Sequence, residues 1–240
     1  QQMRALDEAK KEADRANKAK SEFLSNMSHD IRTPMNGIVG MTAIAMTNIH
    51  DMDRVQDCLK KITLSSKHLL GLINDVLDMS KIENGKLSLN MDQISLRETM
   101  DSIVNIVQPQ IRAKNQHFDI FIQQIETEYI NCDYVRLNQI LINLLSNAVK
   151  FTPNEGTINV YLFQEPSPKG EDYVRCHFRV KDSGIGMSYE FQEKIFDTFT
   201  RDDSKQVQKT EGTGLGMAIT KCIVDAMKGT IEVISTPGKG

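Results

Sequence analysis

The organisation of the chain follows from residues 23–37, which read Phe23-Leu24-Ser25-Asn26-Met27-Ser28-His29-Asp30-Ile31-Arg32-Thr33-Pro34-Met35-Asn36-Gly37. On a helix with about 100° between successive residues, one apolar stripe runs through Phe23, Met27, Ile31 and Met35. His29 lies about 160 to 200° from both Met27 and Ile31, so the pattern predicts that its imidazole faces solvent. A chance surface histidine would give the same pattern, and the role of His29 therefore depends on the rest of the chain.

Upstream of this stretch, residues 1–22 are rich in Ala, Lys, Glu and Arg and contain no Gly or Pro, which favours a helix. Small or apolar residues follow the spacing of a coiled-coil seam into residues 23–27, with Lys20 in one slot. A solvated single helix is the alternative, but it would be marginal without a partner. We therefore predict an N-terminal coiled-coil signalling helix at residues 1–22. A four-residue stutter and Pro34 weaken the continuing helix near His29.

A second apolar seam runs through Val55, Leu59, Ile62, Ser66, Leu69, Ile73 and Val76, and ends before Gly85, a suitable helix stop. The polar residues 48–53 separate it from the first helix. Two such helices bury too little apolar surface alone. We therefore predict that residues 23–88 form a hairpin that dimerises into a four-helix bundle.

From residue 89 the periodicity is that of an α/β domain. A helix predicted at residues 96–114 is followed by segments in which apolar and polar residues alternate, as in strands covered on one face. These segments lie at residues 118–122, 158–162, 174–180 and 231–233. Helices predicted at residues 133–149 and 215–227 would cover the sheet, which makes residues 89–240 a two-layer α/β sandwich.

Composition excludes several classes of protein. The net charge of −3 provides no basic field for a nucleic acid. The four cysteines lack the spacing of a zinc site or a disulfide framework, which is typical of reduced thiols in a cytoplasmic protein. No apolar run approaches the roughly 18 residues of a membrane span, so we expect no membrane contact by this fragment. A longer parent protein can still be anchored in a membrane.

Polar residues that suit nucleotide chemistry lie on one face of the helix predicted at residues 133–149. Asn143, Asn147 and Lys150 are spaced i, i+4 and i+7. Amide oxygens are suitable ligands for Mg²⁺, and a lysine supplies a point charge for phosphate. On this helix alone, solvent-facing asparagines are the favoured explanation.

Two glycine-rich turns follow. Asp182-Ser183-Gly184-Ile185-Gly186 ends a strand, where the carboxylate could accept from an exocyclic amine, or the stretch could be an ordinary turn. Residues 211–217 open an apolar helix whose amides could cradle phosphate, but no strand precedes them as the dinucleotide-binding motif requires. The polar residues 200–209 are either a mobile lid or a plain loop.

Taken in this order, the motifs resemble the transmitter core of sensor histidine kinases, of the type found in hybrid two-component sensors. Residues 28–34 resemble the phosphoacceptor H box, 143–152 the N box, 182–186 the G1 box, 191–199 the F box and 212–216 the G2 box. The resemblance covers nearly the whole chain, and five motifs in order are specific. It implies a dimeric phosphotransfer hairpin followed by a GHKL-type ATP-binding domain.

The resemblance also implies roles for residues. His29 would accept the γ-phosphoryl group of ATP, with Asp30 as base or orienting group and Arg32 and Thr33 flanking the reaction. Asn147, assisted by Asn143, would hold Mg²⁺, Lys150 would reach the phosphates, and Asp182 would bind the adenine amine. Five glycines would let the backbone approach the nucleotide closely: Gly184, Gly186, Gly212, Gly214 and Gly216. Thr213 and Leu215, in the last of these turns, would also contact the nucleotide. The partners implied are a second copy of the chain and a response-regulator receiver domain, whose aspartate would take the phosphoryl group. The spacing of Asp30 and Thr33 also resembles kinases that dephosphorylate the receiver.

Three features depart from the family pattern. Asp30 stands where many relatives have Glu, and Glu211 where many have Gly. The chain ends at Gly240, where the family continues into another strand, so we expect a truncated fragment.

Two alternatives remain: a degenerate relay module that binds nucleotide without phosphotransfer, and an ATPase without a phosphoacceptor. Intact His29, Asn147 and Asp182 count against the first, and the H box against the second.

Overall fold

The computed structural model describes residues 27–198, 200 and 214–240. The described residues divide into two compact units, one that contains residues 27–85 and one that contains residues 86–198 and 216–240. The coiled coil predicted at residues 1–22 lies outside the described residues, as does nearly all of the predicted lid at 200–209.

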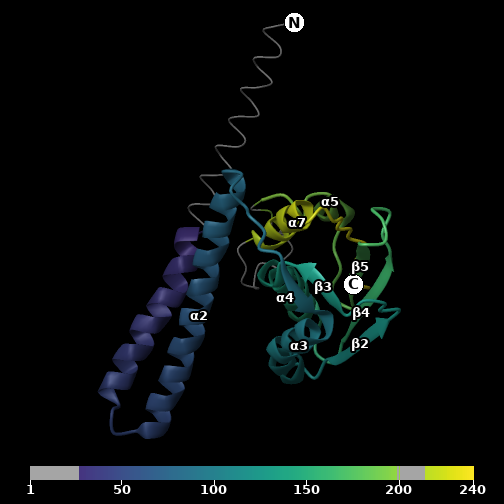
Figure 1. Ribbon diagram of the computed structural model, residues 1–240. Helices are drawn as coiled ribbons and strands as arrows, with labels where there is room; N and C mark the ends of the chain where they lie inside the picture. The colour runs from purple at the N-terminus through teal and green to yellow at the C-terminus, as the bar shows by residue number, and fades with distance from the viewer. Residues whose placement is uncertain (1–26, 199, 201–213) are drawn as a thin grey trace, which may run out of the picture. The chain divides into compact units, whose positions relative to one another are not determined.

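The first unit contains a helical hairpin (Figure 1). Residues 27–47 are helical, a turn follows, and α2 spans Met52–Glu83. Asp51 caps the start of α2, because its side chain accepts a hydrogen bond of 3.1 Å from the amide of Arg54. Beyond the end of α2, Gly85 has φ of 63°, a left-handed conformation that glycine adopts without strain. The predicted hairpin is confirmed.

α2 carries two apolar stripes. Buried and half-buried residues recur at Val55, Cys58, Ile62, Ser65, Leu69, Leu72 and Val76. This stripe meets the first helix, because a Cβ added to Gly37 would lie 3.3 Å from the Ser65 hydroxyl. Exposed apolar residues form a second stripe at Leu59, Leu70, Ile73 and Leu77. The single seam predicted from sequence was wrong, because it drew residues from both stripes.

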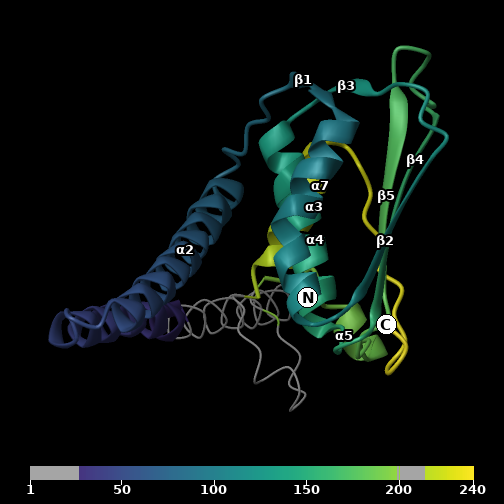
Figure 2. The same ribbon diagram turned by 90° about the horizontal axis from the view of Figure 1, so that it is seen from below.

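The second unit is an α/β sandwich. In chain order its elements are β1 (Asp92–Ser95), α3 (Leu96–Ala113), β2 (His117–Gln123), β3 (Tyr129–Cys132), α4 (Tyr134–Phe151), β4 (Thr157–Pro166), β5 (Val174–Asp182), α5 (Tyr189–Gln192) and α7 (Gly216–Ala226). The main sheet has the order β2-β4-β5, with β2 parallel and β5 antiparallel to β4. β1 and β3 form a separate antiparallel pair. Figure 2 shows α3, α4 and α7 on one face of the main sheet.

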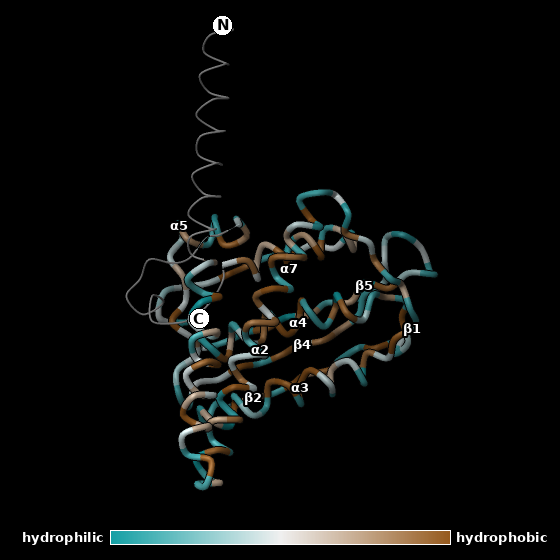
Figure 3. Tube along the Cα trace, turned by 90° about the vertical axis from the view of Figure 1, so that its left-hand side faces the viewer, coloured by the Kyte–Doolittle hydropathy of each residue, from teal (hydrophilic) through white to brown (hydrophobic). Residues whose placement is uncertain are grey.

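The core lies between the sheet and these helices. Ile158, Val160 and Leu162 of β4 are buried, and their neighbours in sequence on the other face are only half-buried. In Figure 3 the hydrophobic colour concentrates along α3, α4 and β4. The alternation predicted from the sequence is thus confirmed for β4 and β5, and for β2 at Phe118 and Ile120. It was wrong for Ile122, which is 50% exposed near the end of β2. The strand predicted at residues 231–233 was wrong: among the described residues β5 pairs with β4 alone, and a segment without such a partner is no strand.

Ile103 of α3 provides a test of this core. Its side chain is 0% exposed, whereas Ile106 on the same helix is 48% exposed. Replacing Ile103 with Ala is expected to lower the free energy of unfolding by about 2–5 kcal/mol, because the cavity cannot close fully. Ile106→Ala is the control, with an expected change within about 0.5 kcal/mol. Urea unfolding followed by circular dichroism measures both, and equal losses of stability would contradict the assigned core.

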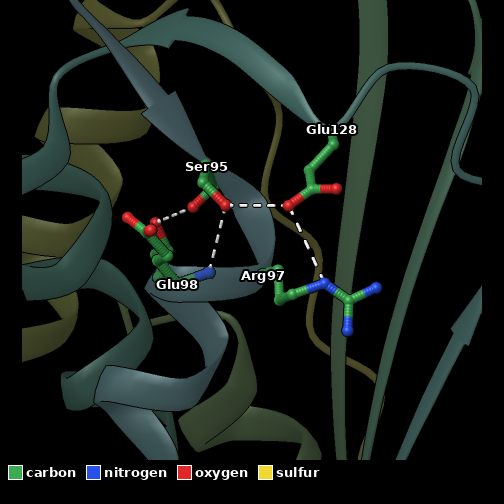
Figure 4. A network of polar contacts seen from close by, with 5 residues as sticks. Ser95, Arg97, Glu98 and Glu128 are labelled. Atoms are coloured by element: carbon green, nitrogen blue, oxygen red, sulfur yellow. Dashed lines mark hydrogen bonds and ion pairs between the residues drawn. The ribbon is translucent and has the colours of Figure 1, made fainter.

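A polar network secures the start of α3. The Ser95 hydroxyl accepts from the amide of Glu98 (3.2 Å) and donates to the Glu128 carboxylate (3.1 Å), which also lies 3.7 Å from Nε of Arg97. Figure 4 shows Ser95 between Glu98 and Glu128. The network ties the loop before β3 to the helix that follows β1. It involves none of the residues predicted for the functional site.

Candidate functional site

His29 lies on the first helix of the hairpin with its side chain 77% exposed, which confirms that it faces solvent. Its Nδ1 is 3.6 Å from Oδ1 of Asp30, an ion-pair distance rather than a hydrogen bond. The Asp30 carboxylate lies on the Nδ1 side of the ring, where it can stabilise a positive charge that develops on the imidazole. The exposed ring is accessible to a reactant from solvent.

The buried side of this helix differs from the predicted stripe. Met27 and Pro34 are buried, Ile31 and Ile38 half-buried, and Met35 exposed. Each four-residue step advances the stripe by about 40°, so Met35 has drifted away from the face begun by Met27. The prediction for Met35 was wrong, because a face that stays in contact alternates steps of four and three residues.

Arg32 and Thr33 follow His29 on the exposed part of the helix. The Thr33 hydroxyl donates a hydrogen bond of 3.1 Å to the carbonyl oxygen of His29, one turn earlier. The hydroxyl must turn away from this carbonyl before it can donate to anything else.

The N-box helix is α4. Asp133, which is buried, caps its start: Oδ1 accepts from the amide of Arg136 at 3.0 Å, and Oδ2 accepts from the amide of Asn90 at 2.8 Å. The core face of α4 carries Leu137, Leu141, Leu145 and Ala148, all of which are buried. This orientation leaves Asn143, Asn147 and Lys150 half-buried on another face, and the Lys150 ammonium lies 4.8 Å from the centre of the Phe151 ring.

Asn143 packs against α7. Its amide donates to the Thr220 hydroxyl at 2.8 Å, and a Cβ on Gly216 would collide with its Oδ1. The structure therefore engages Asn143 between helices, whereas the sequence suggested a metal ligand. Thr220 was missed by the sequence analysis, because a contact across 77 residues leaves no local pattern. A side chain at position 216 would displace the Asn143 amide from this position.

The G1 turn lies against the last turn of α4. Oδ1 of Asp182 accepts from the amide of Gly184 at 2.8 Å, and an ionised carboxylate has further lone pairs for another donor. Gly184 is buried, and a Cβ there would lie 2.8 Å from the Phe151 carbonyl oxygen. The same carbonyl accepts from the amide of Ile185 at 3.3 Å. Asp182 is thus held at the end of α4 that carries Lys150.

Gly186 has φ of 64° and packs against the backbone of Thr236, so a side chain there would be strained and would collide. Of the predicted G2 residues, the structure describes Gly214, with φ of 68°, Leu215, which is buried, and Gly216, the first residue of α7. Gly212, Thr213 and Glu211 lie outside the described residues.

One residue of the predicted F box, Gln192, is fixed by hydrogen bonds to two other segments. Gln192 at the end of α5 exchanges two hydrogen bonds with the backbone of Ser235: its Nε2 donates at 3.0 Å and its Oε1 accepts at 3.1 Å. Nε2 also donates to the Met187 carbonyl at 3.0 Å. Gln192 thus joins the segment after the G1 turn to the segment near the end of the chain.

Two of the four cysteines are buried enough to be poor nucleophiles. All four cysteines lie among the described residues, and none forms a disulfide. Burial raises the pKa of the Cys132 thiol to about 11 and also raises the pKa of Cys176. Both thiols are therefore protonated, and poor nucleophiles, at neutral pH.

A search for membrane-spanning helices in the part of the chain that the structure describes finds none.

Two family models match the chain. Residues 19–85 match the His Kinase A (phospho-acceptor) domain, and residues 132–240 match the histidine kinase-, DNA gyrase B- and HSP90-like ATPase. The first match contains His29, and the second contains α4, the G1 turn and the start of α7.

Curated relatives are similar over nearly all of this chain. The sensor histidine kinase GacS of Pseudomonas protegens is 41% identical over 235 residues, 98% of this chain and 25% of GacS. The autoinducer 2 sensor kinase/phosphatase LuxQ of Vibrio vulnificus (strain YJ016) is 38% identical over 232 residues, 97% of this chain and 27% of LuxQ. The chain thus spans about a quarter of the length of these relatives. Among solved structures, full-length ShkA in complex with AMPPNP has a TM-score of 0.64 and 28% identity, and the likeness covers 91% of this chain and 43% of ShkA.

Proposed function

This chain belongs to the sensor histidine kinases, and on that premise we propose that it autophosphorylates His29 from ATP and passes the phosphoryl group to an aspartate of a response-regulator receiver domain. The observation that carries the proposal is the imidazole of His29, exposed to solvent and flanked by the Asp30 carboxylate. The family match of residues 132–240 supports ATP as the phosphoryl donor. ShkA, the solved relative described above, was crystallised with AMPPNP. We place this activity in the cytoplasm.

The chemistry is an in-line displacement at phosphorus. Nε2 of His29 forms a bond to the γ-phosphorus while the bond to the β–γ bridging oxygen breaks, and ADP leaves. The attack makes the imidazole cationic, and the Asp30 carboxylate beside Nδ1 stabilises this charge or takes the Nδ1 proton. A neutral imidazole next to a carboxylate is a suitable nucleophile near pH 7.

The nucleotide is held by the α/β unit. Asp182 has lone pairs left to accept from the adenine amine, and Lys150 on the adjoining end of α4 attracts the phosphates. The amide oxygen of Asn147, half-buried on the same helix, is a hard donor that fits Mg²⁺. Bound there, Mg²⁺ would neutralise charge on the phosphates. Asn143 contributes through its bond to Thr220, which joins α4 to α7.

The test is incubation of the chain with Mg²⁺ and ATP labelled at the γ-phosphate. The expected product is protein label that survives base and is lost in acid, the behaviour of a phosphoramidate. Transfer to a receiver domain is then followed by loss of this label and gain of acid-stable label on the receiver. Release of free phosphate without labelled protein would instead identify an ATPase, and nucleotide binding without turnover would leave the relay module.

Dimerisation is expected through the exposed stripe of α2 formed by Leu59, Leu70, Ile73 and Leu77. A soluble four-helix bundle would bury such a stripe. Ile73→Glu should weaken the dimer more than about a hundredfold, because each protomer brings a charge into the interface. Leu64 is also exposed and lies about 180° from Ile73, so Leu64→Glu is a matched control. Analytical ultracentrifugation distinguishes the two, and an Ile73→Glu variant that remains dimeric would contradict this interface.

A second activity, dephosphorylation of the receiver, is suggested by the spacing of Asp30 and Thr33 and by the kinase/phosphatase name of LuxQ. Thr33 would release the His29 carbonyl and orient a water molecule. Thr33→Ala should then slow receiver dephosphorylation and leave His29 labelling intact. Unchanged dephosphorylation in that variant removes Thr33 from this role.

A further inference from the structure

The turn between α3 and β2 closes over the C-terminal end of α4. Nζ of Lys114 donates hydrogen bonds to three carbonyl oxygens there, those of Val149 (2.8 Å), Lys150 (2.9 Å) and Thr152 (3.1 Å). The last carbonyls of a helix have no partner within the helix and form the negative end of its dipole. An ammonium at this position therefore supplies both the missing donors and the opposite charge.

Gln116 completes the same contact. Gln116 is only 8% exposed. Its Nε2 donates to the carbonyl oxygens of Val149 (3.1 Å), Thr152 (2.8 Å) and Pro153 (3.3 Å). The backbone holds the turn in place, because the amide of Glu155 donates to the Lys114 carbonyl at 3.0 Å. We call Lys114 and Gln116 the carbonyl clamp.

The end of α4 that the clamp holds is also the end that supports the candidate nucleotide site. Lys150 lies between the clamped carbonyls of Val149 and Thr152. The next carbonyl, that of Phe151, accepts from Ile185 in the G1 turn and limits the space at Gly184. A shift of this helical turn would therefore move Lys150 and the support of Asp182 together.

We propose that Lys114 and Gln116 are positioning residues for ATP: they fix the last turn of α4 so that Lys150 and the Asp182 turn present one rigid nucleotide-binding surface. This inference rests on the proposed nucleotide site. Lys114 and Gln116 act on ATP indirectly. They hold the carbonyl groups at the end of α4, and this raises the affinity for ATP. Without the ammonium, the terminal turn frays, the bond from Ile185 to Phe151 lengthens, and nucleotide binding must first restore the turn.

The test uses the full chain and ATP with Mg²⁺. Lys114→Met keeps the length of the side chain and removes charge and donors. It should raise the Kd for ATP, measured by calorimetry, by about tenfold at a temperature where circular dichroism shows a folded protein. The KM for ATP in His29 labelling should rise equally, with the rate at saturating ATP retained. Lys114→Arg, which keeps charge and donors, should recover most of the affinity. Lys169→Met, in an exposed loop, is the control and should change nothing.

A local readout separates positioning from general stability. Hydrogen exchange of the Ile185 amide should become faster in Lys114→Met, because its acceptor lies on the released turn. A Kd for ATP within about twofold of the wild type in the folded variant would overturn the proposal, whatever its melting temperature. If Lys114→Met does not fold, Gln116→Leu removes the neutral donors alone and is judged by the same Kd. Wild-type protein that binds ATP without labelling His29 would refute the proposed kinase activity and leave this test intact.

Discussion

Replacing His29 with Gln is expected to lower the incorporation of label from γ-labelled ATP by more than about a thousandfold, to background, because the amide has no nucleophilic nitrogen. The His29 side chain is 77% exposed, so the substitution should leave the free energy of unfolding within about 0.5 kcal/mol of the wild type. ATP affinity should also be retained, since no residue of the α/β unit is changed. The experiment thus separates the phosphoacceptor from the nucleotide site.

His50 provides the matched control. It is exposed in the turn after the first helix, and His50→Gln should label at the wild-type rate. Label that persists in His29→Gln would place the acceptor elsewhere. Loss of label in both variants would indicate damage to the hairpin, and circular dichroism of each variant detects such damage.

The second large effect is expected at Asp182. Asp182→Asn keeps the shape of the side chain, and its amide oxygen can still accept from the Gly184 amide, so the turn is preserved. The Asp182→Asn substitution removes the negative charge and replaces one acceptor oxygen by an NH2 group, which is a donor. Hydrogen bonds to charged groups contribute about 1.5–3 kcal/mol, so the Kd for ATP should rise about 10- to 150-fold.

Nucleotide specificity gives this prediction a second readout. A carboxylate that accepts from the 6-amino group of adenine disfavours the 6-oxo group of guanine, whereas an asparagine amide can donate to it. The ratio of ATP to GTP affinity should therefore fall in Asp182→Asn, as measured by calorimetry with each nucleotide. Asp172→Asn, at an exposed position of the loop before β5, is the control. Equal loss of affinity for both nucleotides would indicate a distorted turn, contrary to the role assigned to Asp182.

The sequence predicts the elements whose burial follows a simple period. β4 alternates buried and half-buried residues because helices cover one face of the sheet. For α4 the spacing predicts a core face at Leu137, Leu141, Leu144 and Ala148, and the structure buries all of these except Leu144, which is half-buried while its neighbour Leu145 is buried. Sequence periodicity does not predict which residues are buried in a helix that has apolar residues on two sides. Heptad spacing in α2 does not say which apolar residues meet the first helix, so Leu59 and Ile62 were assigned to one seam although only Ile62 lies inside. Residues 231–233 alternate like a strand but have no strand to pair with among the described residues.

The candidate site shows the same limit. The motifs predict roles for His29, Asp182 and Asn147, because each lies in a local pattern of spacing or glycines. Asn143 was identified as well, but its bond to Thr220 depends on how α7 packs on α4. The carbonyl clamp was missed, since Lys114 reaches carbonyls 35 to 38 residues further along the chain. Contacts of this kind depend on topology, which local periodicity does not contain.

The two oxygens of Asp133 have a consequence for how this protein can evolve. One oxygen caps α4, and the other accepts from the main-chain amide of Asn90, in the segment that leads from α2 to β1. Because the donor is a backbone amide, almost any side chain at position 90 preserves this hydrogen bond, and the connecting peptide can change in sequence while it stays attached to the start of α4. Proline is the exception, since it has no N–H to donate.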